Sequence, residues 1–456
     1  MSNEVLHKGL EEILTNYTPA GEDAMAQYAI DSMVPKAVVS PDSIEALASV
    51  VRLALEHDYG IIPRGGGTKM DMGLPPARAD IIVLLDKMNQ VLEHEPADQT
   101  ITIQAGIRLS DLQIYLSSHG QYWPLDPPHG DLCTVGGVLV TNASGPLRMS
   151  FGAARDLVIG LRVVQADGTI VKSGGKVVKN VAGYDLNKMY IGSLGTLGIL
   201  AEVTLKLQPL PERSHLVIVH YPSISAAVDT AFKLLASDVM PSFIEIANPI
   251  LTGLLAHQSD GDSGDGEVAL VAGFLGQEET VKWQVTACEN LFQEAGGIRI
   301  IQMEGDPYQM TLDLLQSFPT GQVVPQGMLF RITCRASVPP EMVGDLYQKA
   351  EDRCQKLSIG CGMLAHFSSG HMTFVFYQAA SFETAHLDTL AAVINDLQKA
   401  AVESGGSFVV EHAPTGLKSR IEVWGAERDD LPIMRLLKNK FDPKGIFNKG
   451  RFIGGI

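Results

Sequence analysis

Cysteine is scarce in this 456-residue chain, and the few cysteines are scattered. No C-x-x-C pair and no ferredoxin-like series occurs among the five, which are Cys133, Cys288, Cys334, Cys354 and Cys361. An odd, dispersed set is typical of reduced, buried thiols and argues against a disulfide framework or an iron–sulfur site. If the protein handles electrons, another chain must carry any iron–sulfur clusters.

Positive charge is also in short supply. The sequence has 35 Lys and Arg residues against 52 Asp and Glu residues, a formal net charge of -17. A body this acidic repels nucleic acid and anionic lipid surfaces. A small anionic substrate is still compatible with it, because a few local Arg or Lys side chains can dominate a pocket.

Long hydrophobic runs are missing as well. No uninterrupted apolar stretch reaches the roughly 18 to 20 residues that a membrane-spanning helix needs, and the first residues, Met1–Lys8, lack the pattern of a secretory signal. We therefore expect a cytoplasmic protein that reaches a membrane only through partner subunits. A 45% hydrophobic content over this length predicts a globular chain with two or three units.

Hydrophobic periodicity predicts strands and helices in alternating order after a helical segment over residues 1–34. Ser40–Ser43 offers capping oxygens and a helix-compatible proline before a helix over 44–57. Pro209 and Pro211 mark a boundary, beyond which a separate α+β unit begins. The predicted helices are 4–14, 22–33, 44–57, 109–119, 225–236, 278–295, 340–357, 383–404 and 431–441, and the predicted strands are 37–39, 59–63, 81–85, 100–105, 215–220, 243–246, 268–274, 330–334, 373–377 and 407–411.

Glycine is abundant where the other types are not, with 45 copies, and it gathers in runs. The runs Pro63–Thr68, Thr134–Gly145 and Gly192–Gly198 each place glycines beside a short apolar segment that we predict to be a strand. Backbone amides are then uncovered where a flat or phosphate-bearing ligand could approach. A fourth small motif, Asn448–Arg451, lies near the C-terminus. The four pieces predict one cofactor site closed by the whole chain.

Two common glycine loops do not fit. A Walker A loop needs G-x-x-x-x-G-K-[ST], but Gly175 and Lys176 are followed by Val177, and Ile170 stands where the first glycine belongs. The dinucleotide fingerprint G-x-G-x-x-G fails because Met70 stands at the place of its third glycine. We favour a nest, in which the amides of 64–69 and of 135–137 converge on a pyrophosphate. The alternative, glycines that serve only tight turns, suffices for any one run but poorly explains three.

These motifs, in this order, resemble the FAD-binding half of the vanillyl-alcohol-oxidase/PCMH flavoprotein superfamily. The matching segments are Pro63–Thr68, Pro124–Pro128, Thr134–Gly137, Ser144–Arg148 and Gly183–Leu186. More narrowly, the chain is similar to the FAD-binding E subunits of bacterial glycolate oxidase (glycolate dehydrogenase). That closer resemblance rests on residues 177–186, 412–414, 423–425 and 441–455.

The resemblance implies an α+β fold: a PCMH-type two-subdomain FAD-binding fold with an α+β cap domain and a C-terminal segment that returns to the FAD domain. The implied division is a helical segment at 1–34, the FAD-binding domain at 35–212, the cap or substrate domain at 213–406 and the closing segment at 407–456. FAD is the implied cofactor. The residues implied to bind it are Arg64, Gly65, Gly66, Gly67, Thr68, Asp126, Thr134, Val135, Gly136, Gly137, Asn142, Ala143, Gly145, Arg148, Gly192, Ser193, Thr196, Gly198, Ile199, Asn448 and Arg451.

Two details of the resemblance bear on how FAD is held. Where members of the superfamily attach flavin covalently, they usually do so through a histidine in the first glycine loop, and this chain has Thr68 at that place. Members with a second covalent bond add a cysteine near Thr134, but Cys133 lies one residue too close to match. We therefore predict non-covalent FAD.

On the substrate side, related 2-hydroxy-acid dehydrogenases hold a divalent metal with a His, a second His seven residues on, and a Glu from a later Glu-His pair. Here His366 and Glu411 match, but Thr373 stands at the place of the second His, and His371 is displaced by two positions. Two surviving ligands make a weak site, so we predict no tightly held metal. The acidic run 260–267 resembles a calcium loop in composition but not in ligand spacing, which favours a solvated surface loop.

The resemblance implies two catalytic residues. His412 is the candidate base that takes a hydroxyl proton while hydride passes to the flavin, although a purely structural histidine is an equal alternative. Arg451 is the candidate cation beside the reduced flavin ring. Two functions stay open: a flavin dehydrogenase that oxidises glycolate or a similar acid such as D-lactate and passes electrons to an iron–sulfur partner, or a non-catalytic electron-relay or assembly subunit. A sister FAD subunit and an iron–sulfur subunit are the implied partners.

Overall fold

The computed structural model describes residues 3–175, 184–258, 266–321, 330–378 and 384–456. The chain forms two compact units. Unit 1 comprises residues 1–144, 152–209 and 427–456, and unit 2 comprises residues 145–151 and 210–426. Most of the motif at 177–186 and most of the acidic run at 260–267 lie outside the described residues, so those two interpretations stay predictions.

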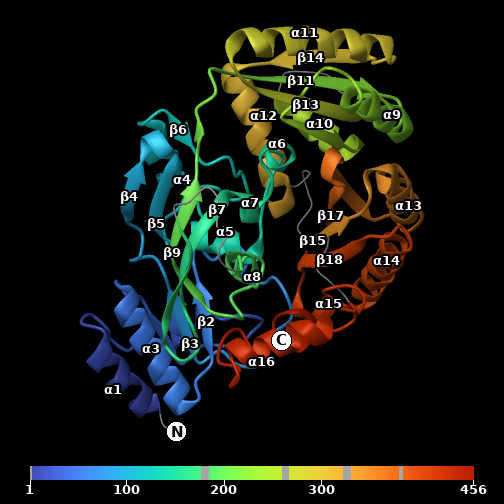
Figure 1. The fold of residues 1–456 in the computed structure, drawn as a ribbon. Helices are drawn as coiled ribbons and strands as arrows, with labels where there is room; N and C mark the ends of the chain where they lie inside the picture. The colour runs from blue at the N-terminus through green and yellow to red at the C-terminus, as the bar shows by residue number, and fades with distance from the viewer. Residues whose placement is uncertain (1–2, 176–183, 259–265, 322–329, 379–383) are drawn as a thin grey trace. The chain divides into compact units, whose positions relative to one another are not determined.

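Unit 1 contains a three-stranded parallel sheet in the order β1-β3-β2, formed by Ala37–Val39, Ile81–Leu84 and Ile61–Arg64. Helix α3 (Ile44–His57) begins at Ser43, whose hydroxyl accepts a hydrogen bond from the Ala46 amide at 3.3 Å. This cap and the apolar spacing that follows it explain why the helix was predicted with correct bounds. Helices α1 (Asn3–Ile13) and α3 bury their apolar faces in the same core as this sheet (Figure 1).

A second sheet of unit 1 has five antiparallel strands in the order β4-β5-β9-β7-β8. They are Val91–Glu95, Thr100–Gln104, Ile199–Lys206, Val158–Val164 and Ile170–Gly174. Their core also includes side chains from α4 (Leu109–Ser117) and α5 (Val135–Thr141). The smaller elements of the unit are α2 (Glu22–Ala26), η1 (Pro96–Asp98), β6 (Gln121–Tyr122), α7 (Ala154–Leu157), α8 (Asn187–Tyr190), β10 (Gln208–Pro209), α16 (Leu431–Phe441) and η5 (Ile453–Gly455).

Two local predictions in unit 1 are wrong. The apolar run after Thr134 was expected to be a strand but is helix α5, because the Thr134 hydroxyl caps it by accepting from the Gly137 amide at 3.3 Å. The helix predicted over 22–33 ends at Ala26. Asp31 and Ser32 adopt positive φ angles of 47° and 73°, which no right-handed helix can contain.

Unit 2 is built on one eight-stranded sheet in the order β14-β11-β13-β12-β16-β17-β15-β18. Every paired neighbour in it is antiparallel. The strands, in sheet order, are Arg299–Met303, Arg213–Tyr221, Val268–Gly276, Phe243–Ala247, Gly360–His366, His371–Gln378, Phe330–Ser337 and Ser407–His412.

Helices cover this sheet, with α9 and α11 beside β11 and β13, and α14 beside β18 (Figure 1). The helical elements are α6 (Arg148–Phe151), α9 (Ile224–Leu235), α10 (Pro249–Gln258), α11 (Glu278–Glu294), α12 (Gly305–Ser317), η2 (Phe318–Thr320), η3 (Pro340–Met342), α13 (Val343–Lys356), η4 (Phe367–Ser369), α14 (Thr384–Glu403) and α15 (Thr415–Lys418). The sequence did not predict α10, α12, β14 or β16. Among the described residues, no helix is both long and apolar enough to cross a membrane.

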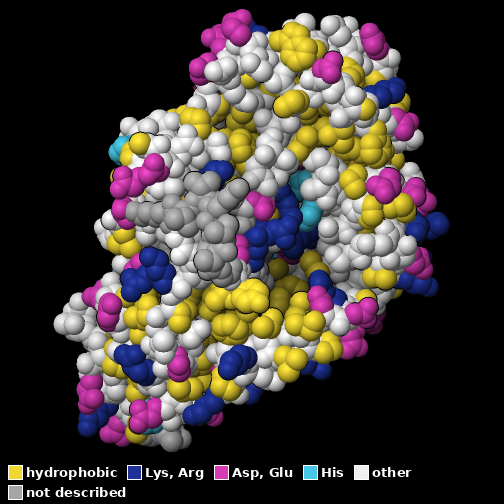
Figure 2. All heavy atoms as spheres, viewed as in Figure 1, with side chains coloured by type: hydrophobic (Ala, Val, Ile, Leu, Met, Phe, Trp, Pro, Cys, Tyr) yellow, Lys and Arg dark blue, Asp and Glu magenta, His cyan; other side chains and the backbone are white. Residues whose placement is uncertain are grey.

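Acidic side chains are common on the surface, as the net charge of the chain leads one to expect. On the face drawn in Figure 2, Asp and Glu side chains are scattered over both units and do not form one acidic field. The predicted cytoplasmic location stays a prediction.

Candidate functional site

The first glycine run forms a loop whose amides are unoccupied. It follows β2 directly, and the amides of Gly65, Gly66, Gly67 and Thr68 donate no hydrogen bond to any residue that the structure describes. A Cβ on Gly66 would lie 1.8 Å from the Leu132 carbonyl oxygen, and one on Gly65 would lie 2.0 Å from the Thr134 hydroxyl. Only glycine fits so close to a neighbouring segment. Consecutive unoccupied amides on a chain without side chains suit an anionic group such as a pyrophosphate.

The second run does not offer its amides in the same way. The amide of Val135 donates to the Ile107 carbonyl at 3.0 Å, and that of Gly136 donates to the Ala105 carbonyl at 2.8 Å. The Gly137 amide donates to the hydroxyl of Thr134. The expectation that these three amides converge on a pyrophosphate is therefore wrong, because the protein already satisfies them. Their segment still forms a wall of the same pocket through Thr134, Gly136 and Gly137.

The C-terminal segment holds the third glycine run and the first loop in place. The side-chain amide of Asn448 donates to the Leu194 carbonyl at 2.6 Å, and its backbone amide donates to the Ile61 carbonyl at 3.0 Å. Arg451 donates to the carbonyls of Met70 and Met72, the latter at 3.0 Å. Residues almost 400 positions apart therefore meet in one unit, as the four separated motifs predicted.

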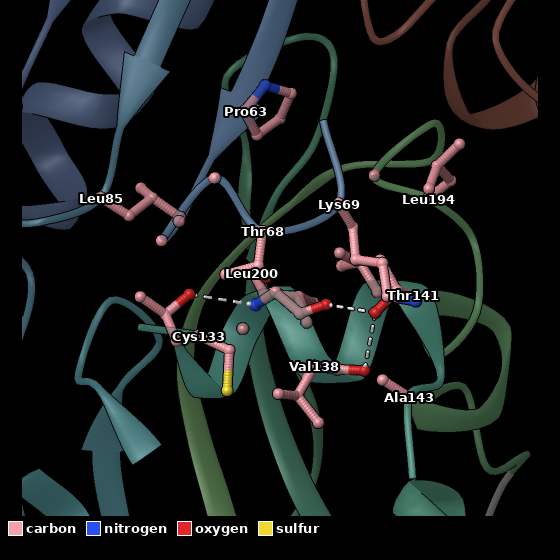
Figure 3. Close-up of a pocket in the computed structure, with 18 of the residues that line it drawn as sticks. Pro63, Thr68, Lys69, Leu85, Cys133, Val138, Thr141, Ala143, Leu194 and Leu200 are labelled. Atoms are coloured by element: carbon pink, nitrogen blue, oxygen red, sulfur yellow. Dashed lines mark hydrogen bonds between the residues drawn. The ribbon is translucent and has the colours of Figure 1, made fainter. Parts of the chain in front are cut away.

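These pieces enclose a pocket in unit 1. Figure 3 shows Thr68 and Lys69 of the glycine loop, Thr141 and Val138 of α5, and Leu194 of the third run around it. The lining is Pro63, Gly65, Gly66, Gly67, Thr68, Lys69, Met70, Leu85, Pro127, Pro128, Cys133, Thr134, Gly136, Gly137, Val138, Val140, Thr141, Ala143, Leu194, Gly195, Gly198, Ile199, Leu200, Asn448 and Arg451.

Several residues predicted to bind the cofactor lie outside this lining. They are Arg64, Asp126, Val135, Asn142, Gly192, Ser193 and Thr196 of unit 1, and Gly145 and Arg148 of unit 2. The guanidinium of Arg64 lies over the Tyr28 ring, 5.1 Å from its centroid. The Ser193 hydroxyl donates to the Tyr190 carbonyl at the end of α8, and the Thr196 hydroxyl donates to the Ser193 carbonyl. Asn142 ends α5 with a positive φ of 49°, and its buried Oδ1 has no partner among the described residues.

Some lining residues were missed. Leu85 and Leu200 are apolar residues at or near strand ends, which sequence alone cannot separate from ordinary core. Lys69 could have been found, since it follows the glycine triplet after one residue, Thr68, and offers a cation beside the unoccupied amides. Cys133 also lines the pocket, and burial raises the pKa of its thiol to about 12. A thiol with that pKa is almost entirely protonated at neutral pH and is therefore a poor nucleophile.

Unit 2 carries a second constellation, on one face of its sheet. Strand pairing places Glu245, His366 and His371 directly opposite one another on β12, β16 and β17. Arg335 on β15 lies opposite Thr373, two residues beyond His371 and therefore on the same face. Two steps further along that strand, Thr333 pairs with His412 of β18. The partly buried His412 thus lies at one end of a polar strip formed by these residues.

Two pairs of ionisable groups are in contact in the strip. His366 Nδ1 lies 2.6 Å from Glu245 Oε1, and Arg335 Nε lies 3.3 Å from Glu411 Oε1. Glu245 is fully buried, and this burial raises the pKa of its carboxyl. Burial lowers the pKa of His371 to about 3, with smaller contributions from the charges of Arg148 and Arg335. His371 is therefore neutral at physiological pH, and its Nδ1 donates to the Ser369 carbonyl at 3.0 Å.

The arrangement of His366 and Glu411 bears on metal binding. They come from β16 and β18, between which β17 and β15 lie in the sheet order. No group of three or more His, Cys, Asp or Glu side chains able to hold a metal ion occurs in the part of the chain that the structure describes. Each residue instead contacts a protein partner of its own, Glu245 or Arg335.

The neutral His371 gives a prediction about acid stability. Because the folded state holds the pKa near 3 and the unfolded state returns it to about 6.5, the unfolded chain binds more protons between these values. We therefore expect the free energy of unfolding to fall as the pH drops from about 6.5 towards 3. Urea unfolding of the wild type and of His371→Asn checks this. The asparagine variant should lose less stability over that window, and identical pH profiles would contradict the assignment.

Two family models match the chain. Residues 35–174 match the family described as "FAD binding domain", and residues 210–452 match "FAD linked oxidases, C-terminal domain". The second match alone spans more than half of the chain. The chain belongs to the FAD-linked oxidases. FAD is therefore its cofactor, and this FAD-linked oxidase is an oxidoreductase.

Relatives of this FAD-linked oxidase match over more than nine tenths of this chain. "Glycolate oxidase subunit GlcD" of Bacillus subtilis is 28% identical over 436 residues, which cover 94% of this chain and 90% of the relative. "D-lactate dehydrogenase [cytochrome], mitochondrial" of Arabidopsis thaliana is 26% identical over 426 residues. The match covers 92% of this chain and 74% of that relative. The predicted resemblance to glycolate oxidase flavin subunits is confirmed, although the relative is the GlcD subunit and the motifs had suggested the E subunit.

Solved structures confirm the predicted PCMH-type fold. The structure of p-cresol methylhydroxylase with substrate bound has a TM-score of 0.80 at 18% identity and covers 98% of this chain and 96% of its own. An alkyldihydroxyacetonephosphate synthase has a TM-score of 0.72 at 19% identity. The match covers 99% of this chain and 86% of the synthase chain. At these identities the likeness concerns the fold of the FAD-linked oxidase alone.

Proposed function

We propose that this chain oxidises glycolate, or a similar short 2-hydroxy acid such as D-lactate, to the corresponding 2-oxo acid. The pocket of unit 1 carries the proposal, because its glycine loop leaves four successive amides for a phosphate-bearing cofactor. The similarity to a glycolate oxidase subunit and to a D-lactate dehydrogenase supports the substrate class. Bound FAD supplies the chemistry of accepting a hydride from the carbon that bears the hydroxyl.

The predicted cofactor residues that line the pocket are proposed to hold FAD without a covalent bond. Gly65 to Thr68 would hold the pyrophosphate. Arg451 is 2% exposed, and burial lowers the pKa of its guanidinium only to about 10, so it remains a cation at neutral pH. A buried cation in this pocket stabilises negative charge on a reduced flavin ring. Thr68 in place of a histidine and the protonated thiol of Cys133 both support non-covalent binding.

His412 is proposed as the base that accepts the hydroxyl proton. We expect His412→Ala to lower kcat for glycolate by about 10²- to 10⁴-fold, the usual contribution of a general base, with its FAD content unchanged. Steady-state kinetics with an artificial electron acceptor measure the change. His215→Ala is the matched control, because that buried histidine sits far along the same sheet on β11 and hydrogen-bonds Gln302. Full activity of His412→Ala would remove His412 from the chemistry.

The second candidate function is a flavin-bearing relay or assembly subunit. It is favoured by Thr373, which stands where related dehydrogenases have the second metal-binding histidine. In either case we propose a complex with a sister FAD subunit and an iron–sulfur subunit, since the described cysteines are free, buried thiols. The division at residues 34, 212 and 406 remains our proposal for how the chain is organised into domains.

Anaerobic reduction of the flavin separates the two functions. The FAD-loaded chain is mixed with glycolate, D-lactate, L-lactate or glycolamide, and the absorbance near the flavin maximum is followed. Bleaching by glycolate or D-lactate, and not by the neutral glycolamide, supports the dehydrogenase. Absence of bleaching by every hydroxy acid, together with reduction once a partner subunit is added, supports the relay.

A further inference from the structure

Two cysteines of unit 2 lie side by side although they are seven positions apart in the sequence. Cys354 lies in the last turn of α13, on the buried side of that helix, and Cys361 is the second residue of β16. The two elements pack against each other, and each of the two residues is 4% exposed. The Cys361 thiol donates a hydrogen bond to the Cys354 sulfur. The two sulfur atoms are therefore in direct contact.

Backbone hydrogen bonds bring the two cysteines together. The Ile359 amide donates to the Cys354 carbonyl at 2.9 Å, and the Ser358 amide donates to the Gln355 carbonyl at 3.2 Å. Ser358 adopts a positive φ of 53°. These features form a Schellman motif, which ends a helix and turns the chain sharply. The chain enters β16 directly after this motif, so the geometry of the main chain sets the approach of the two sulfurs.

A third cysteine on the same sheet is too far from Cys361 to form a disulfide with it. Cys334 of β15 lies opposite Phe374 of β17, and Cys361 lies opposite Phe376 of the same strand. Strand β17 therefore stands between the two cysteines. Because neighbouring strands are about 4.8 Å apart, the Cα atoms of Cys334 and Cys361 are separated by roughly 10 Å. A disulfide requires less than about 7 Å.

The hydrogen bond makes the two thiols chemically unequal. By donating to the Cys354 sulfur, the Cys361 thiol lowers the pKa of Cys354, against the opposing effect of burial. Burial holds the pKa of Cys361 well above its usual value, and the same hydrogen bond adds to this shift. The thiolate is the reactive form of cysteine, so Cys354 is the sulfur that reacts first with an oxidant. Cys361 is then in place to complete a disulfide with it.

We propose that Cys354 and Cys361 are a reversible oxidation site, at which a hydroperoxide converts the two thiols to a disulfide. The Cys354 thiolate attacks hydrogen peroxide: an S–O bond forms, the O–O bond breaks, and the released hydroxide takes up a proton to give water. The Cys361 sulfur then attacks the Cys354 sulfur. The S–S bond forms, the S–O bond breaks, and the leaving hydroxide takes the Cys361 proton as a second water. Two electrons pass from the sulfurs to the peroxide, whichever acid reduces the flavin.

Peptide mapping of the FAD-loaded full chain tests this site. The protein is treated with hydrogen peroxide, its remaining thiols are blocked with N-ethylmaleimide, and trypsin cuts after Lys356, between the two cysteines. We expect two peptides joined through Cys354 and Cys361, with a mass two hydrogen atoms below the sum of the reduced peptides. Dithiothreitol added before blocking should remove the bridge by thiol–disulfide exchange. Both cysteines still reduced, at a peroxide concentration that oxidises them in the urea-unfolded chain, would refute the site.

Serine variants separate the roles of the cysteines, with the circular dichroism spectrum as the check that each variant has folded. Cys334→Ser is the control and should form the bridge as the wild type does. Cys361→Ser should leave Cys354 as a sulfenic acid that dimedone traps, because the second sulfur is missing. Cys354→Ser should leave Cys361 reduced. A bridge between any other pair of cysteines, or dimedone labelling of Cys361 in place of Cys354, would refute the assigned roles. The wild-type map decides the pairing by itself if a variant does not fold.

Discussion

Gly66→Ala is expected to weaken FAD binding at least about tenfold, which corresponds to 1.4 kcal/mol. The added Cβ would lie 1.8 Å from the Leu132 carbonyl oxygen and 2.8 Å from the Leu132 carbonyl carbon. Both obstacles are backbone atoms, so relief requires the whole glycine loop or the segment before α5 to move. Overpacking of this kind typically costs about 1–3 kcal/mol. The affinity of the apoprotein for added FAD, followed by flavin fluorescence, measures the effect.

The loop has little freedom to yield. It follows β2, which pairs with β3 on one side and bridges Phe447 at Ile61 on the other. Gly130→Ala is a suitable control, because a Cβ at Gly130 meets no atom within 4 Å and lies only two residues before Leu132. It should bind FAD as the wild type does. Wild-type FAD affinity in Gly66→Ala would contradict the assignment of this loop to the cofactor.

Lys438→Met is expected to lower the stability of unit 1 by about 3–5 kcal/mol, the usual cost of removing one partner of a buried ion pair. The ammonium of Lys438 donates to Asp442 Oδ2 at 2.7 Å, to the Thr196 carbonyl at 2.8 Å and to the Phe447 carbonyl at 2.9 Å. It therefore ties α16 to the third glycine run and to the C-terminal segment. Its loss leaves the carboxylate of Asp442, which is 1% exposed, without its cation.

Urea unfolding of the holoprotein, followed by flavin fluorescence, measures this loss. Lys440→Met provides the control on the same helix, because Lys440 is exposed, and it should unfold as the wild type does. The double variant Lys438→Met/Asp442→Asn should recover part of the stability, since the uncompensated charge is then gone. A single Lys438→Met variant as stable as Lys440→Met would show that the lysine does not hold the segment together.

The sequence predicted best where one local signal decided the structure. The capped and periodic helix α3 was predicted with correct bounds, and the pocket loop at Gly65–Thr68 was found from its glycines alone. Prediction failed where local signals competed. The run after Thr134 has the β-branched composition of a strand, yet the threonine cap makes it helical.

Other features had no local signal. Glu245 carries no motif, and it meets His366 only because β12 and β16 pair across more than 100 residues of sequence. Arg148 lies beside flavin motifs, so its sequence position suggested the cofactor, whereas the chain folds it into unit 2. In both cases the chemistry depends on non-local contacts of the fold, which spacing in the sequence does not encode.

The most direct test of the account is the visible spectrum of the purified chain after reconstitution with FAD, followed by acid precipitation. The account predicts flavin absorbance at close to one FAD per chain, with the flavin released into the supernatant because no covalent bond holds it. A chain that binds no flavin under these conditions would contradict the site built from the glycine loops and the C-terminal segment. Flavin that stays with the pellet would contradict non-covalent binding and point to Cys133.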